Sequence, residues 1–333
     1  MSHKKKYFYI PLAVGGIILA IWYGVWLQGA KLMKETIVKF ADDETSDTSS
    51  LTFNSIKVSG FPFFLRGKVD APVYTTANGL NWSGEKLYMD ADIISPSQLT
   101  FSPRGDHIIS DATGDTWHIN DDSARASFEA LLDGRWVVKL AGDRMKATQS
   151  SGETVHVLDY LINVQPSKEL ENAVEASILV GAAALDGGLY EGNPIKLDGI
   201  EFAARLHAIS LAKTDTIQEW KAAGGHLEIQ RAAIFMDDAL FSLRGNISID
   251  REGFPTGAVN ALVEKPAKLA PLFVGLGQLS NEEADAARSG LMVVGLATGG
   301  KINGPIEMKN GAAHLLDIQI ARLPQVTVEE NQP

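Results

Sequence analysis

The stretch FSLRGNISID, residues 241–250, indicates the fold class of this 333-residue chain. Apolar residues take every second position except that of Gly245, and polar residues stand between them. A period of two places the apolar side chains on one face of a β-strand and the polar ones on the other. The stretch therefore predicts an antiparallel strand with one face against a core or a ligand and one face in water.

The same alternation extends outward from this strand in both directions. It precedes the stretch in Leu227–Phe235, with Asp237-Asp238 as the expected turn between the two strands. Further alternating stretches lie at residues 86–93, 136–140, 160–164, 195–206 and 316–320. The phase of the alternation slips at Gly199, which suggests a β-bulge. We therefore expect a mainly β protein, a β-rich α+β fold built from long curved antiparallel sheets.

The sequence predicts only a few short helices. They are expected at Asp122–Leu132, Asp215–Ala223, Lys268–Leu276 and, after the capping box Ser280–Glu283, at Ala284–Leu296. Residues 170–185 are rich in small side chains and fit either a helix or a strand. A possible boundary near Pro166 suggests three regions: residues 1–44 with the membrane segment, 45–165 as a first β-rich region, and 166–333 as a second one that can be continuous with the first.

A long uncharged stretch, Tyr7–Leu27, lies near the N-terminus. About 20 apolar residues span the hydrocarbon core of a bilayer as a helix. Aromatic residues mark both ends of the stretch, as they do at membrane interfaces. The expected anchor residues are Tyr7, Trp22, Tyr23, Trp26 and Leu27. We favour a transmembrane helix over a buried core helix, and the helical periodicity continues through Lys31–Phe40.

The lysines Lys4–Lys6 directly precede this stretch. Positive residues stay on the cytoplasmic side, so we expect a single-pass protein of a bacterial inner membrane with a cytoplasmic N-terminus and the bulk of the chain in the periplasm. A cleaved signal peptide is the alternative. The apolar core of a signal peptide has about 7–15 residues, which is shorter than the uncharged stretch found here. In addition, Gln28 occupies a position before the possible cleavage site where a small residue is needed. Both observations favour an uncleaved anchor.

The composition excludes several classes of function. The net charge of −11 repels nucleic acid and argues against the capture of lipids through headgroup charge. Because the chain has no cysteine, disulfides and thiolate metal ligands are excluded. The seven histidines show no metal-binding spacing, and the serines lie in no nucleophile-elbow context. We therefore expect no enzyme, with no catalytic residue, no cofactor, no metal site and no nucleic-acid partner.

A short aromatic stretch follows the anchor. Its four residues, between Gly60 and Leu65, are Phe61, Pro62, Phe63 and Phe64. One interpretation is a kinked strand whose aromatic rings plug one end of the core, and it is favoured because aromatic clusters are usually buried. The other interpretation is an apolar lip that faces the membrane or contacts lipid.

Several motifs together resemble a known family. They are Gly60-Phe61-Pro62-Phe63 after a predicted strand, Trp220–Ile229, Gly245–Gly257, Asn310-Gly311 and Ala321–Pro324. In this order they resemble the domain of unknown function 2125 family of bacterial envelope proteins, over most of the chain beyond the anchor. The family implies an architecture and no established activity. The anchor, strand and Gly-Phe-Pro arrangement is also similar to AsmA-like envelope proteins, whose grooved sheets are associated with lipid handling; this second likeness is at the level of fold.

Two functions from different classes fit these observations. The first is a non-enzymatic protein that binds or handles lipid acyl chains in an apolar trough of a curved sheet. It follows from strands with one apolar face and too few helices to cover that face. The alternative is a structural or assembly scaffold of the cell envelope with a protein partner. The expected partners are thus the lipid bilayer, a lipid ligand and an envelope protein.

Overall fold

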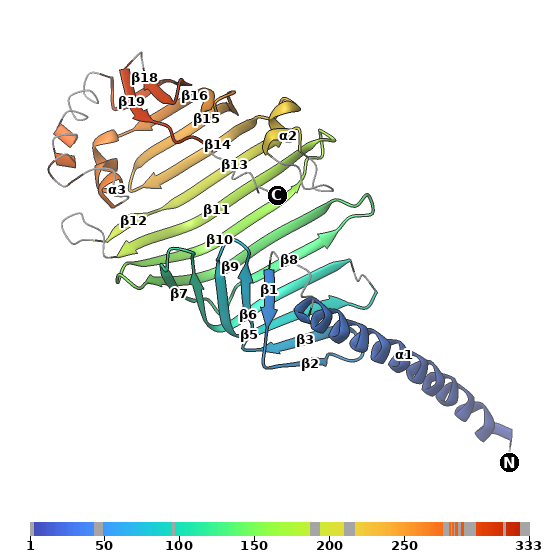
Figure 1. Ribbon diagram of the computed structural model, residues 1–333. Helices are drawn as coiled ribbons and strands as arrows, with labels where there is room; N and C mark the ends of the chain where they lie inside the picture. Colours follow the sequence, from blue (N-terminus) through green and yellow to red (C-terminus); the bar gives the residue numbers. More distant parts are fainter. Residues whose placement is uncertain are drawn as a thin grey trace. The chain divides into compact units, whose positions relative to one another are not determined.

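The computed structural model describes residues 3–42, 49–94, 97–186, 194–209, 217–275, 280, 282, 284–285, 288–289, 298–315 and 318–326. One long N-terminal helix precedes a succession of antiparallel strands with few short helices (Figure 1). The predicted mainly β fold is confirmed. Contacts within the chain group it into two units, residues 1–129 and residues 130–333. The division into regions 45–165 and 166–333 stays a prediction.

Helix α1 (His3–Asp42) is a single uninterrupted helix. Its part from Val14 to Ala41 is long and apolar enough to cross a membrane, by length and composition. Ile17, Ile18 and Leu19 are exposed. A core helix of a soluble protein would bury such side chains against other elements. The predicted apolar helix is therefore present, and it continues well beyond Leu27.

The first unit contains an antiparallel sheet. Its strands are β1 (Ser49–Thr52), β2 (Ser55–Ser59), β3 (Phe64–Asp70), β4 (Val73–Thr76), β5 (Asn81–Asp92), β6 (Gln98–Ser110), β7 (Thr116–Asn120) and β8 (Arg125–Ala130). Strand β3 lies between β2 and β5, β5 also pairs with β6, and β6 pairs with β8 and then with β7. Strand β4 joins the start of β5 to β1.

The predicted helix Asp122–Leu132 is wrong, because this segment forms β8. The carboxylate of Asp121 accepts hydrogen bonds from the backbone N–H groups of Ser123 and Ala124, both at 2.8 Å. These bonds make a turn that leads the chain into an extended conformation. Apolar residues also recur here with a period of two, and Phe128 lies directly opposite Leu99 of β6. Pairing with a neighbouring strand thus outweighs the helical pattern.

The second unit is a meander of strands. They are β9 (Trp136–Gln149), β10 (Thr154–Pro166), β11 (Ala173–Asp186), β12 (Ile195–Leu197), β13 (Gly199–His207), β14 (Leu227–Met236), β15 (Ala239–Ile249), β16 (Pro255–Glu264), β17 (Lys301–Lys309), β18 (Ala312–Leu315) and β19 (Ile318–Arg322). Each sheet neighbour follows in chain order, except that β11 pairs with both β12 and β13.

Several local predictions can be compared with this unit. Residues 170–185, which fit either element, are mainly strand β11. The turn at Asp237-Asp238 is confirmed. The slip in phase near Gly199 coincides with a break at Asp198, which separates β12 from β13. A further shift of register lies between Ala203 and Ala204.

The short helices of this unit are α2 (Ile217–Ala222), the 3₁₀ helix η1 (Pro266–Leu269) and α3 (Ala270–Gly275). They confirm the helices expected at Asp215–Ala223 and Lys268–Leu276. The helix expected at Ala284–Leu296 lies largely outside the described residues. Leu272 of α3 packs with Ile195 and Leu197 of β12, so α3 covers one end of the strands.

Candidate apolar binding groove

The sheet of the first unit has one apolar face. Neighbouring strands place Leu65, Ala91 and Leu99 side by side in one row. The next row along the same face contains Gly67, Met89 and Phe101. Since residues two apart share a face, β3, β5 and β6 present a continuous apolar surface here.

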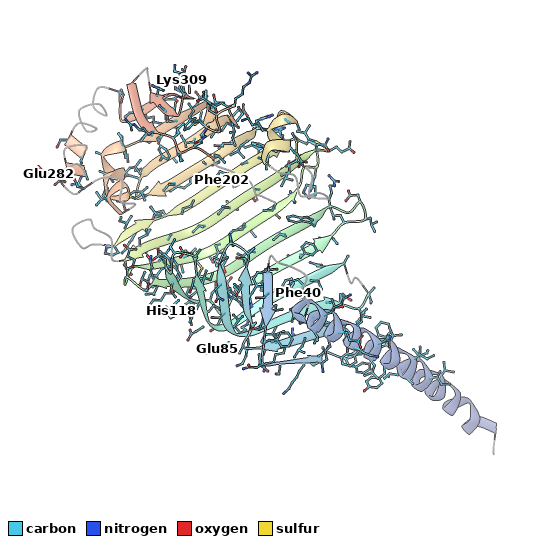
Figure 2. All side chains as sticks on the ribbon, in the orientation of Figure 1. Phe40, Glu85, His118, Phe202, Glu282 and Lys309 are labelled. Carbon is cyan, nitrogen blue, oxygen red and sulfur yellow. The ribbon has the colours of Figure 1, made fainter. Side chains whose placement is uncertain are left out.

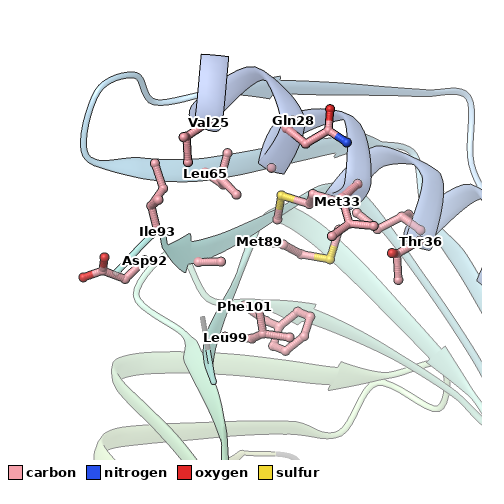
Figure 3. A pocket seen from close by; sticks show the side chains of 14 residues that line it. Val25, Gln28, Met33, Thr36, Leu65, Met89, Asp92, Ile93, Leu99 and Phe101 are labelled. Carbon is pink, nitrogen blue, oxygen red and sulfur yellow. The ribbon is translucent and has the colours of Figure 1, made fainter. Parts of the chain in front are cut away.

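Helix α1 passes over this surface and leaves a cavity of about 650 Å³ between helix and sheet (Figure 3). The helix contributes Val25, Gln28, Gly29, Leu32, Met33, Thr36 and Ile37, and the strands contribute Leu65, Met89, Ala91, Asp92, Ile93, Leu99 and Phe101. We call this cavity the helix–sheet groove. Among the described residues, Asp92 is the single charged residue that lines the groove. Figure 3 shows its carboxylate at the edge, directed away from Met33 and Met89.

Two glycines let the helix and the sheet approach each other. A Cβ atom on Gly29 of α1 would lie 3.1 Å from a terminal methyl group of Leu65. A Cβ atom on Gly67 of β3 would lie 3.3 Å from the terminal methyl group of Met33. Both distances are below ordinary van der Waals contact. The width of the groove therefore depends on the absence of side chains at these two positions.

The aromatic stretch is held against α1 at the start of the groove. The indole nitrogen of Trp22 donates a hydrogen bond to the carbonyl oxygen of Pro62 at 2.7 Å, and that of Trp26 to Phe64 at 3.0 Å. The ring of Phe61 meets the ring of Tyr23 edge-on, with centroids 5.2 Å apart. The structure thus brings together the predicted aromatic end of the anchor and the predicted lip.

The remaining predicted anchor residues are Leu27 and Tyr7. Leu27 is exposed on α1. Tyr7 lies in the first part of the same helix, and its side chain is outside the described residues. Their contact with a membrane stays a prediction.

The stretch 61–64 does not plug the core. Phe61, Phe63 and Phe64 are 37%, 74% and 39% exposed, so the interpretation favoured on the sequence is wrong. A core plug needs packing partners on all sides of each ring, whereas the hydrogen bonds from Trp22 and Trp26 hold the backbone of this stretch at the surface. The role of these residues as a membrane-facing lip stays a prediction.

The second unit carries an apolar sheet face of its own. One row across adjacent strands consists of Leu140, Ile162, Ile178, Phe202, Ala232, Leu243 and Ala261. A neighbouring row consists of Tyr160, Val180, Ile200, Ile234, Phe241, Val263 and Ile302. Phe202, labelled in Figure 2 on β13, is only half-buried. The face is therefore apolar across many strands, and the side chain of Phe202 on it stays partly exposed.

The ionisable groups suggest no catalytic arrangement in the part of the chain that the structure describes. No group of three His, Asp or Glu side chains there could hold a metal ion. Asp90 is paired with Arg66. His107 is 4% exposed, and neither ring nitrogen has a hydrogen-bond partner among the described residues. Burial lowers the pKa of His107. That the protein is not an enzyme stays a prediction.

The groove was not foreseen from the sequence. One wall is the part of α1 from Val25 to Ile37, whose helical periodicity was visible through Leu32 and Ile37. The other wall comes from three strands that follow it. Gly29 and Gly67 are the signal that could have indicated close packing of helix and sheet.

A family model with the description "Uncharacterized protein conserved in bacteria (DUF2125)" matches residues 26–324. The chain belongs to the DUF2125 family. The DUF2125 match begins at Trp26, so it includes both the strands of the helix–sheet groove and most of its helical wall. No curated protein and no solved structure matches the chain. The likeness to AsmA-like proteins is therefore not shown.

Proposed function

We propose that this protein is a non-enzymatic, membrane-anchored protein of the periplasm that binds lipid acyl chains in the helix–sheet groove. The observation that supports the proposal most is the shared helix: α1 provides both the apolar membrane segment and one wall of the groove. Val25 at the start of the groove follows Trp22 by less than one helical turn. In the proposed topology, a lipid acyl chain that leaves the outer leaflet enters the groove beside the aromatic residues at the membrane interface.

The lining fits an acyl chain. The cavity of about 650 Å³ lies within the range of about 300–1,000 Å³ that is usual for small-molecule sites. Each methylene group moved from water into such a lining contributes about 0.8 kcal/mol. Met33 and Met89 have flexible side chains that adapt to chains of different shape. We expect little selectivity for the headgroup inside the groove, because Asp92 is the single charged residue among the described residues that line it.

The test is to fill the groove with a larger side chain introduced on helix α1. The full chain is purified in a mild detergent, incubated with radiolabelled fatty acid or phospholipid, and separated by gel filtration. We expect Gly29→Phe to reduce the bound label several-fold. Gly24→Phe is the matched control, since a Cβ at Gly24 of the same helix meets no atom within 4 Å. Equal label on the original chain and on both variants, or no label on any of them, would contradict the proposal.

A scaffold with a protein partner is the second candidate function. One observation favours it: Leu161 of β10 lies directly opposite Leu179 of β11, and the two are 38% and 46% exposed. Exposed apolar residues in contact are typical of interaction surfaces. Crosslinking in intact cells tests this, because Leu161→Lys should reduce a specific crosslinked product while Lys139→Gln, on an exposed position of β9, should leave it unchanged. If the purified chain binds no radiolabelled lipid in the groove assay while the crosslinked product forms in cells, the scaffold function is favoured.

A further inference from the structure

The sheet of the first unit has a second cavity on its other face. It has a volume of about 300 Å³. Arg66 lies directly opposite Asp90, which lies opposite Thr100; in the next row Tyr88 lies opposite Ser102. Apart from Asp92 at the edge of the groove, the groove residues of these strands alternate with these residues. The two sets therefore point to opposite sides of the same strands. Arg104 and Arg125 complete the lining.

The charge in this cavity is positive, although the chain as a whole has a net charge of −11. Asp90 binds Arg66 through both carboxylate oxygens, at 2.6 and 2.8 Å. This hydrogen-bonded pair raises the pKa of Arg66. Arg104 donates to the backbone carbonyls of Pro103 and Ala124. Within the described ranges, neither Arg104 nor Arg125 has a carboxylate partner, so two guanidinium charges remain uncompensated.

We propose that the cavity lined by Arg66, Arg104 and Arg125 binds a phosphate group. Guanidinium groups present forked N–H donors that match the oxygens of phosphate, and hydrogen bonds between ions of opposite charge are the strong ones. The hydroxyl groups of Thr100 and Ser102 offer further donors from the floor of the cavity. Because Asp90 is neutralised by Arg66, it opposes an incoming anion little.

The position of the cavity favours the phosphate of a lipid headgroup as its source. Arg66 follows Phe64 by two residues, and its guanidinium lies 5.1 Å from the centre of the Phe64 ring. The backbone of Phe64 is in turn hydrogen-bonded to Trp26 of the anchor helix. In the proposed topology the arginines therefore stand close to the level of the headgroups. The acidic net charge had argued against headgroup attraction, whereas the local charge has the opposite sign.

The test uses the reaction of arginine with phenylglyoxal, read by peptide mass spectrometry on the full chain in a maltoside detergent. Inorganic phosphate should slow the modification of Arg125 several-fold relative to chloride at equal ionic strength. Arg231 and Arg244, on the second unit, should react at an unchanged rate. Equal slowing at all three arginines, or no slowing at Arg125, would overturn the proposal.

Two further experiments identify where the bound phosphate comes from and exclude a general effect of charge. Protection of Arg125 in phosphatidylcholine nanodiscs without free phosphate assigns the site to lipid headgroups; protection only by inorganic phosphate assigns it to the free anion. For Arg125→Gln, we expect phosphate to bind roughly tenfold more weakly or worse, as read from the modification of Arg104. Arg244→Gln removes the same charge elsewhere and should have no effect. Unchanged binding in Arg125→Gln would contradict the proposal.

This inference does not depend on acyl-chain binding. Gly29→Phe fills the groove on the opposite face of the sheet, and it should leave the protection of Arg125 by phosphate unchanged. Loss of acyl-chain label with intact protection, or the reverse, therefore distinguishes the failure of one proposal from the failure of the other.

Discussion

The indole nitrogen of Trp22 lies 2.7 Å from the carbonyl oxygen of Pro62, forty residues further along the chain. One helical turn later, Trp26 makes the same kind of bond to Phe64. These two bonds hold the stretch 61–64 on the helix at the start of the helix–sheet groove. A helix that is apolar enough to enter a bilayer is thus tied by its side chains to the folded sheet that follows it.

Removing the two indole donors should loosen this attachment. Trp22→Phe and Trp26→Phe replace the indole by a smaller phenyl ring, so each loses one N–H donor and part of its aromatic surface. We expect each to lower the free energy of unfolding by about 1 kcal/mol, the usual net value of such a bond. Thermal unfolding of the first unit in the full chain measures the effect. Tyr23→Phe keeps the ring contact with Phe61 and serves as the control; an equal loss of stability there would contradict this explanation.

The orientation of β15 can be tested by two neighbouring substitutions. Ile247 packs against the cluster that contains Ile229, Val259 and Met308. Ile247→Asp should destabilise the second unit by about 3 kcal/mol or more, because it places an unpaired charge among apolar side chains. Ser248→Asp points to the other face and should cost less than about 0.5 kcal/mol. Urea unfolding compares the two, and similar effects would show that the faces are assigned wrongly.

His107 should make the stability of the first unit depend on pH. Burial lowers its pKa below the ordinary value of 6.5, against the opposing effect of Asp106, Glu85, Asp121 and Asp122. As pH falls below about 6.5, the unfolded chain takes up a proton that the folded chain excludes. Stability is therefore full above this pH and should decrease as pH falls toward the lowered pKa, by at most about 1.4 kcal/mol per pH unit.

The measurement is chemical unfolding at pH 7 and pH 5. His107→Phe keeps a ring that can stack on Trp82, whose centroid lies 5.8 Å from that of His107. This variant should lose part of the difference in stability between the two pH values. His118→Gln changes an exposed histidine of β7 and should retain the difference. A difference that survives in His107→Phe would mean that other groups cause it.

The direction of insertion can be measured in cells. A reporter that is active only outside the cytoplasm should be active when fused after Pro333 and inactive when fused before Lys4, because the lysines at positions 4–6 hold the N-terminus inside. The full chain should remain in the membrane fraction. A mature N-terminus near Lys31, found by sequencing the purified protein, would instead indicate a cleaved signal peptide.

The strands were predictable where side-chain alternation was clean, as at residues 241–250, because a period of two needs only local information. Residues 122–132 show where this fails. Their apolar residues fit periods of both two and 3.6, and the choice was made by Asp121 and by pairing with Leu99, which no local pattern contains. Residues 170–185 were ambiguous for the same reason.

The two cavities depend on contacts that are distant in sequence. Met33 and Met89 both line the helix–sheet groove although one is on the helix and the other on β5. Arg66 of β3 and Arg125 of β8 share a cavity although β5 and β6 lie between these two strands in the sheet. Net charge also concealed the second cavity, since a sum over the chain says nothing of where charges gather. Only the register of the strands places the arginines together.

In the proposed topology, one end of helix α1 lies in a bilayer and the other end carries the first unit. The 40 residues of α1 make a helix about 60 Å long, roughly twice the thickness of the hydrocarbon core. A helix in a thinner membrane tilts further to keep its apolar length covered. Because Trp22 and Trp26 of this helix form hydrogen bonds to the first unit, such a tilt would change the orientation of the mouth of the groove as well. In the proposed topology, membrane thickness would therefore set the angle between the groove and the membrane surface.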